Sequence, residues 1–331
     1  IGIVPRISAI GSWLLYASIY TGGQRFLSFQ WDILLLEAGF LAIWIAPVCL
    51  RFQLKSKLPL SRGCVFLMHW LLFRLMFFSG VTKLASGDPV WTDLTALAYH
   101  YETQPLTTWT AWYMHQFPKW FHQFSTGFMF FVELVIPFFI FGPRRIKLIA
   151  WFYISLLMVL ILITGNYTFF NLLTMSLCIF LLDDHVLKRI SKKNLDFFER
   201  AKEGLSNWLR IKKKIVVLFV MMILILSSSH TILRYFPDVK IPQFIGKSLN
   251  FIRPFGVINT YGLFSVMTIE RPELIMEKSE NGVDWEEIQF KWKVGEESIH
   301  PGFVQPHQPR LDWQMWFAAL FFEQVDEIYW Q

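Results

Sequence analysis

The side chains best suited to acid-base chemistry lie in and near residues 94–104, whose sequence is LTALAYHYETQ. His100 and Glu102 could act as general acid and base together with Lys83, because histidine and a desolvated lysine can both titrate near neutral pH. The alternative is structural: these side chains form a hydrogen-bonded plug between the ends of helices, and we favour it. The polar and aromatic members of the stretch are His100, Tyr101, Glu102 and Gln104.

Three charged residues, Glu37, Arg74 and Glu133, lie within apolar runs. A charge in the hydrocarbon of a membrane costs on the order of 3 kcal/mol or more unless it is paired. The functional interpretation is a substrate or proton site. The alternative, which we favour, is that these residues pair with one another or with polar neighbours such as His69 and fix the packing of the helices.

Residues 306–320, PHQPRLDWQMWFAAL, combine prolines with an Arg-Leu-Asp and two tryptophans. Tryptophan and arginine are over-represented at binding hot spots, so an exposed segment of this composition would contact another protein. Alternatively, Trp313 and Trp316 dock this end of the chain onto its own tail domain or onto the membrane interface. Both interpretations stay open. The candidate contact residues are His307, Arg310, Asp312, Trp313 and Trp316.

Asn166, Tyr167 and Thr168 form an N-glycosylation sequon between two apolar segments. The turn that holds it leaves little room for the transferase at the membrane surface, so we expect Asn166 to be unmodified. We expect Asn166 and Asn171 to cap the two helices instead.

No spacing typical of a metal site or of a common hydrolase occurs in the chain. Its eight histidines do not pair at i, i+3 or i+4 with Asp, Glu or Cys in a usual ligand pattern. GxSxG, a Walker loop, CxxC and HExxH are absent as well. The sequence therefore predicts no metal, no cofactor and no catalytic set of an ordinary hydrolase or ATPase.

The elements that position these residues belong to a membrane protein. The 331 residues are 54% hydrophobic and include 34 Phe and 15 Trp, more apolar than the roughly 45–50% of an ordinary soluble protein. The mean hydropathy is +0.40. Cys49, Cys64 and Cys178 lie in or beside apolar segments, so a disulfide framework is excluded for the tail.

The net charge of +6 is unevenly distributed. Residues 51–63, 142–147 and 183–214 hold 17 basic and 5 acidic residues, whereas the rest holds 14 basic and 20 acidic residues. Lys and Arg in short loops mark the cytoplasmic side of a membrane protein. The charge therefore indicates topology, and we expect no nucleic-acid partner.

Six segments are apolar enough to cross a bilayer, and residues 7–20 form a weaker seventh candidate, short and diluted by Ser and Gly. The six are residues 33–50, 64–84, 125–141, 148–163, 169–182 and 215–232. With the basic loops inside, alternation places the connection 85–124 and everything after residue 232 on the exoplasmic side. The sequence thus predicts an α-helical multi-pass membrane protein with six or seven transmembrane helices in residues 1–232. A transporter would need internal inverted symmetry, and no repeat is evident.

The tail, residues 233–331, has a different pattern. Residues 289–294, QFKWKV, alternate polar with apolar side chains, and residues 273–278 offer a second strand before an Asn281-Gly282 turn. We therefore predict an exoplasmic, β-rich, sandwich-like domain. The chain starts at Ile1 and stops in a polar run, which suggests a fragment with a truncated tail.

Seven runs of the sequence, taken in order, resemble the lipase maturation factor family. Its members are multi-pass proteins of the endoplasmic reticulum membrane with bacterial relatives. The matching runs are FLSFQWDILLLEAGFLA (26–42), HWLLFRLMFFSGVTKL (69–84), LTALAYHYETQPL (94–106), TGNYTFFNLLT (164–174), LLDD (181–184), YGLFSVMT (261–268) and PHQPRLDWQMWFAAL (306–320). The resemblance implies a non-enzymatic folding or assembly factor for secreted lipases that holds its client on the luminal side. It also implies an endoplasmic reticulum membrane location, or the inner or plasma membrane of a bacterial source, with membrane lipids as further partners.

A second resemblance supplies an alternative. The run VTKLASGDPVW (81–91) is similar to a stretch of vitamin K-dependent carboxylases, integral membrane enzymes in which the lysine acts as a base. If the likeness reflects chemistry, Lys83 would be the base and His100 a helper. If it reflects only shared ancestry, which we prefer, Lys83 extends to the membrane interface.

Overall fold

The computed structural model describes residues 3–50, 61–183, 186, 207–295 and 300–320. The chain forms two compact units that interleave along the sequence. Unit 1 comprises Ile1–Val81, Glu133–Ser155 and Leu172–Leu263, and unit 2 comprises Thr82–Val132, Leu156–Asn171 and Phe264–Gln331. The division at residue 232 into a membrane region and a tail stays a prediction.

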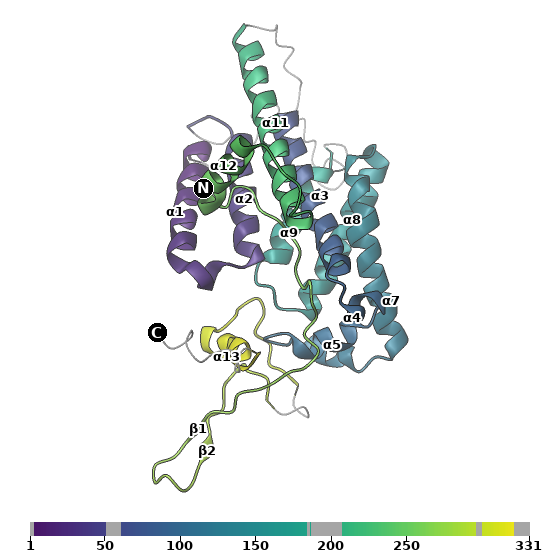
Figure 1. Ribbon diagram of the computed structural model, residues 1–331, viewed down its shortest axis with the longest axis vertical. Helices are drawn as coiled ribbons and strands as arrows, with labels where there is room; N and C mark the ends of the chain where they lie inside the picture. The colour runs from purple at the N-terminus through teal and green to yellow at the C-terminus, as the bar shows by residue number, and fades with distance from the viewer. Residues whose placement is uncertain (1–2, 51–60, 184–185, 187–206, 296–299, 321–331) are drawn as a thin grey trace. The chain divides into compact units, whose positions relative to one another are not determined.

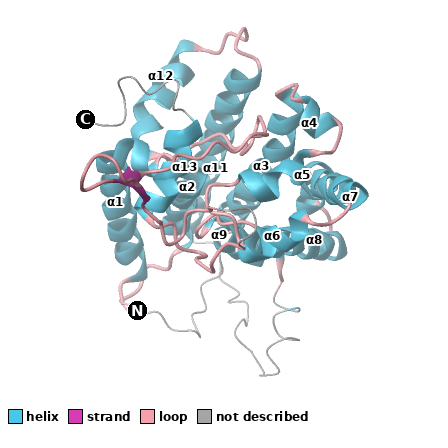
Figure 2. Ribbon diagram, turned by 90° about the horizontal axis from the view of Figure 1, so that it is seen from below, coloured by secondary structure: helices cyan, strands magenta, loops and turns pink. Residues whose placement is uncertain are grey.

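Helices are the main regular structure of the described residues, as Figures 1 and 2 show. The longer helices are α1 (Pro5–Gly23), α2 (Gln30–Ile45), α3 (Arg62–Ala85), α7 (Lys119–Phe130), α8 (Arg144–Thr164), α9 (Phe170–Cys178), α11 (Asn207–Tyr235), α12 (Gln243–Ile252) and α13 (Arg310–Leu320). The shorter ones are η1 (Gln24–Leu27), α4 (Pro89–Thr92), α5 (Ala96–Thr103), α6 (Trp109–His115), η2 (Phe131–Val135), η3 (Ile136–Phe141), η4 (Ile179–Leu181) and η5 (Arg253–Phe255).

Four helical segments of the described residues are long and apolar enough to cross a membrane. They are Arg62–Ala85, Lys119–Phe141, Arg144–Thr164 and Lys214–Tyr235. Phe170–Leu181 is a shorter apolar segment, and α2, with 16 residues, is about 24 Å long. Each predicted span therefore overlaps a helix, while the count of six or seven crossings stays a prediction.

Prolines explain two helix boundaries of unit 1. Helix α2 ends at Ile45, and Ala46 is extended at ψ 132°, because Pro47 disfavours a helical residue before it. In the third apolar segment Pro137 cannot donate to the carbonyl of Glu133, so the helix widens into the π-turn η2 before continuing as the 3-10 helix η3.

Close packing beside η2 requires the glycine in α3. A Cβ on Gly80 would lie 2.7 Å from a methyl carbon of Leu134 and 3.2 Å from the Cβ of Glu133. The missing side chain therefore lets α3 approach the widened turn that carries Glu133, which is 6% exposed. The core of unit 1 contains several fully buried leucines of α2 and α3. Its members include Leu34, Leu36, Leu67, Leu71, Leu72 and Leu75.

The tail is largely irregular in the described residues, and the sandwich-like domain is not confirmed. One antiparallel ladder joins β1 (Glu277–Lys278) to β2 (Glu286–Glu287) around the predicted turn, where Gly282 has φ +73°. The strand predicted at residues 289–294 is wrong. The N–H groups of Trp292 and Lys293 donate to Asp312 Oδ1 at 2.6 and 2.9 Å, so a side chain replaces a neighbouring strand.

Candidate functional site

The stretch 94–104 forms the short helix α5 of unit 2, and most of its side chains serve packing. The chain enters the helix through Leu94, whose φ is +58°. Tyr101 is 5% exposed and Gln104 3% exposed, and burial raises the pKa of Tyr101 to about 12. Glu102 points outward, with its carboxylate 3.7 Å from His115 Nε2. Tyr99 and Glu102 are the exposed residues of the stretch, and His100 is partly buried.

His100 faces the turn that follows α8. Its Nε2 lies 2.6 Å from the Tyr167 hydroxyl, and the two rings are stacked. The rings of His100 and Phe264 form a T-shaped pair with 5.0 Å between centroids. Burial and the nearby charge of Lys83 lower the pKa of His100 to about 4. Burial raises the pKa of Tyr167, so the protonated phenol and the neutral imidazole share this hydrogen bond.

A histidine of this kind is a poor general base at neutral pH. The most efficient bases have a pKa near the working pH, and the pKa of His100 lies well below it. The geometry of the His100–Tyr167 pair therefore favours the hydrogen-bonded plug over acid-base chemistry.

Lys83 does not extend to the surface, contrary to the interpretation in which its side chain reaches the membrane interface. The side chain is 4% exposed, and its ammonium lies 5.5 Å from the centre of the Trp91 ring. Trp91 is itself 2% exposed and donates from Nε1 to the carbonyl of Phe264 at 3.0 Å. A desolvated cation over an indole face is a stabilising contact of about 2 kcal/mol, so this position has a structural explanation.

The C-terminal motif 306–320 meets α5 directly. Trp316 donates from Nε1 to the carbonyl of Thr103 at 2.8 Å, and Thr103 Oγ1 donates to the carbonyl of Thr268 at 3.0 Å. Trp313 is 5% exposed. Of the two interpretations of this motif, docking onto the chain itself therefore fits both tryptophans better than an exposed contact surface.

The turn between α8 and α9 is held by the same two motifs. Asn166 Nδ2 donates to the carbonyl of His307 at 2.8 Å, and Gln308 Nε2 donates back to the carbonyl of Asn166 at 2.8 Å. Gln104 Nε2 donates to the carbonyl of Thr164 at 3.0 Å. The predicted capping by Asn166 and Asn171 is wrong, because the Asn166 amide binds the C-terminal motif and the buried Asn171 amide has no hydrogen-bond partner in the described structure.

Arg271 is a central residue that the sequence did not single out. Its Nη1 donates to the carbonyls of Glu102 and Gln104 at 2.7 and 2.6 Å, and its Nε donates to Glu273 at 2.7 Å. A guanidinium at the C-terminal end of α5 satisfies carbonyls that the helix leaves open. Burial lowers its pKa. Nothing in its local sequence signals this role, because the partner helix lies far away in the chain.

The remaining predicted contact residues differ in exposure. His307 and Arg310 are exposed, and the Arg310 guanidinium lies 5.7 Å from the centre of the Trp313 ring. The Asp312 carboxylate already accepts hydrogen bonds from the backbone N–H groups of Trp292 and Lys293. His307 and Arg310 are thus the members of the set that a partner could reach most easily.

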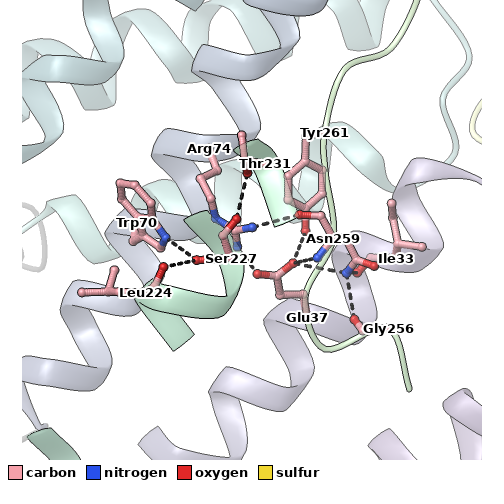
Figure 3. Close-up of polar contacts among 10 residues, drawn as sticks. All are labelled: Ile33, Glu37, Trp70, Arg74, Leu224, Ser227, Thr231, Gly256, Asn259 and Tyr261. Carbon is pink, nitrogen blue, oxygen red and sulfur yellow. Dashed lines mark hydrogen bonds and ion pairs between the residues drawn. The ribbon is translucent and has the colours of Figure 1, made fainter. Parts of the chain in front are cut away.

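In unit 1, Glu37 and Arg74 pair, as the favoured interpretation predicts (Figure 3). Both are 1% exposed. The Glu37 carboxylate also accepts from the backbone N–H of Asn259 at 3.0 Å and from the Tyr261 hydroxyl at 2.8 Å. Asn259 and Tyr261, from the segment after α12, complete this cluster, and neither was singled out from the sequence. Burial and the charge of Glu37 raise the pKa of Tyr261.

Two further polar residues lie in the predicted spans. His69 Nε2 lies 2.8 Å from the carbonyl of Phe180, which is a local bond to the end of η4. Glu133 is on η2 and is 6% exposed. The described residues contain no group of three His, Cys, Asp or Glu side chains placed to hold a metal ion.

One open groove of unit 2 is apolar and holds none of the predicted site residues. It has a volume of about 610 Å³. Its lining is Leu94, Gln123, Phe124, Gly127, Phe128 and Phe131. A groove without convergent polar groups does not suggest catalysis.

The four long apolar helices are those of a multi-pass membrane protein. Residues 6–189 match the family described as lipase maturation factor transmembrane domain, and residues 257–330 match the lipase maturation factor C-terminal domain. The chain belongs to the lipase maturation factor family.

Its relatives include proteins of both named types. Lipase maturation factor 2 of Mus musculus is 37% identical, with 93% of this chain and 58% of the relative aligned. Lipase maturation factor 2 of Gallus gallus is 34% identical, with 93% and 56% aligned. Lipase maturation factor 1 of Mus musculus is 32% identical, with 96% and 57% aligned. The chain therefore spans a little over half the length of these relatives. No solved structure matches it.

Proposed function

We propose that this protein is a non-enzymatic maturation factor that holds secreted lipases on the luminal face of the endoplasmic reticulum membrane, or at the inner or plasma membrane in a bacterium. The names of its relatives support a role in lipase maturation in general. They describe maturation factors, so they do not favour the carboxylase-like alternative with Lys83 as base.

The observation that carries the proposal is the network of hydrogen bonds in unit 2. Side chains of α5, of the turn after α8 and of the C-terminal motif donate to one another's backbone carbonyls. Such a network fixes the backbone of an otherwise irregular tail. A fixed surface can present apolar side chains to a client without collapsing around them.

The client would contact the exposed side chains of this tail and not the docked tryptophans. Phe303 is 74% exposed and Leu311 61% exposed, and Arg310 lies beside Leu311 on the first turn of α13. Aromatic, aliphatic and arginine side chains together are typical of a protein-contact surface. Trp316 would contribute by fixing α13 to α5 through its hydrogen bond to the carbonyl of Thr103.

The test is co-expression with a secreted lipase, measuring active and total lipase in the medium. We expect Phe303→Ser with Leu311→Ser to reduce the active fraction several-fold while the factor stays folded in the membrane. Val283→Ser, at an equally exposed residue of the β1–β2 turn, is the matched control. Undiminished active lipase with the double variant, or an equal loss with the control, would contradict the proposed surface.

Client holding also makes a physical prediction. Detergent-solubilised wild-type protein should co-purify with inactive lipase, and mass analysis of the released client should show no covalent difference from the unassisted lipase. A reproducible covalent change on the client would replace the holding role by an enzymatic one.

A further inference from the structure

Helix α12 of unit 1 exposes a stripe of phenylalanines. Phe244 is 69% exposed and Phe251 is 75% exposed. They are seven residues apart, which places them on one side of a helix with 3.6 residues per turn. Phe255 in η5 continues the stripe and is 43% exposed. Large aromatic side chains grouped in this way signal contact with something other than water.

The rest of α12 divides into two further faces. Ile245 and Leu249 are buried and attach the helix to unit 1. Gln243 and Asn250 are exposed, and at about 100° per residue both lie about a quarter turn from the phenylalanines. The surface that α12 exposes is therefore itself amphipathic, with an aromatic flank and a polar flank.

The position of α12 in the chain keeps it near the bilayer. It follows α11, whose apolar part Lys214–Tyr235 is a candidate membrane span, and the two helices pack together. The connection, residues 236–242, is seven residues long and can reach at most about 25 Å. Phe236 within it is 62% exposed. Exposed aromatic side chains therefore follow the candidate span both in the connection and on α12.

Charge on and beside α12 suits a phospholipid surface. Lys240, Lys247 and Arg253 are exposed, against the single acidic residue Asp238 in residues 236–255. Interfacial helices combine aromatic side chains at the boundary of headgroups and acyl chains with cations that contact phosphate groups. A protein partner would not explain why the aromatic flank and the cations follow directly on a membrane span.

We propose that α12 lies along the bilayer surface at the end of α11, with Phe244 and Phe251 inserted at the boundary of headgroups and acyl chains. Lys247 lies at the level of the lipid phosphates, and Asn250 faces water. The contact anchors unit 1 independently of lipase binding.

The test places one spin label at a time on α12 of the whole protein, reconstituted in phosphatidylcholine vesicles with a minor anionic phospholipid. The background is Cys49→Ser, Cys64→Ala and Cys178→Ala. The labelled variants are Phe244→Cys, Lys247→Cys, Asn250→Cys and Phe251→Cys. Collisions with oxygen, which enters lipid, are compared with collisions with a water-soluble nickel complex. Positions 250 and 251 are adjacent, so each controls for folding and local crowding at the other.

We expect labels at 244 and 251 to collide more with oxygen, the label at 250 to collide several-fold more with nickel, and the label at 247 to fall between them. Equal access of nickel to 250 and 251 would show that the stripe is in water. Protection of 251 from both reagents would show that protein covers it. Either result would overturn the proposal.

Discussion

Replacement of Arg74 by methionine removes the cation that neutralises Glu37 and keeps most of the apolar stem of the side chain. Both residues are 1% exposed, so water cannot take over from the guanidinium. The donors left to the carboxylate are the Asn259 backbone N–H at 3.0 Å, the Asn259 amide at 3.2 Å and the Tyr261 hydroxyl at 2.8 Å. They are neutral dipoles and cannot cancel a full charge.

The expected loss in the free energy of unfolding for Arg74→Met is about 3–5 kcal/mol, the range for removing one partner of a buried ion pair. The lost bond from Arg74 Nη1 to the carbonyl of Asn259, 2.9 Å long, adds about 1 kcal/mol. Glu37→Gln in the same chain removes the uncompensated charge and keeps an oxygen that accepts from Asn259 and Tyr261. The double variant should therefore recover at least about 2 kcal/mol relative to additive losses.

The assay is unfolding by sodium dodecyl sulfate in mixed micelles, followed by the fluorescence of the 15 tryptophans. The two single variants, the double variant and the wild type form one double-mutant cycle. Two results would refute the reasoning that Arg74→Met leaves an uncompensated charge on Glu37. One is a double variant whose loss in unfolding free energy equals the sum of the two single losses, and the other is a loss below about 1 kcal/mol for Arg74→Met.

Four further predictions concern unit 2. Trp316→Ala should lower active lipase in co-expression several-fold, and Trp316→Phe, which loses only the bond to the backbone, should lower it less; equal losses would point to a role for the ring alone. The pKa of His100 is about 4 in the folded state and about 6.5 when unfolded. The unfolded state therefore binds more protons between these values, and stability should fall as pH drops from 6.5 to 4 by up to about 3 kcal/mol. His100→Gln should flatten this part of the curve of unfolding free energy against pH. Asn166 is 8% exposed and donates to His307, so glycosidase treatment of the protein expressed in a secretory pathway should leave its electrophoretic mobility unchanged. Lys83→Met should retain lipase maturation, measured as active over total lipase, and a complete loss in a folded variant would revive the carboxylase-like alternative.

The sequence alone determined the features that depend on local composition. Every span that the apolar runs predicted overlaps a helix of the structure, although the predicted span 33–50 runs past Pro47 and past the end of α2 at Ile45. The cost of charge in hydrocarbon was enough to favour pairing of Glu37 with Arg74, although the sequence could not choose between this partner and others such as His69. The family could be recognised from the sequence because its motifs are long runs of residues that occur in a fixed order.

Local patterning failed in the tail. Residues 289–294 alternate polar with apolar side chains, yet they form no strand, because Asp312 binds the backbone N–H groups of Trp292 and Lys293 that a neighbouring strand would have bound. Alternation indicates which side chains are suited to one buried face, and it says nothing about whether a partner strand exists.

Only the tertiary structure decided what the motifs do to one another. Trp316 binds a carbonyl 213 residues earlier in the chain, and Arg271 reaches one 169 residues away. A backbone carbonyl is the same acceptor at every position, so no residue type marks it as a partner in advance. Hydrophobicity and charge belong to individual residues and can be read along the chain, whereas these bonds exist only when the fold brings a particular donor to a particular carbonyl.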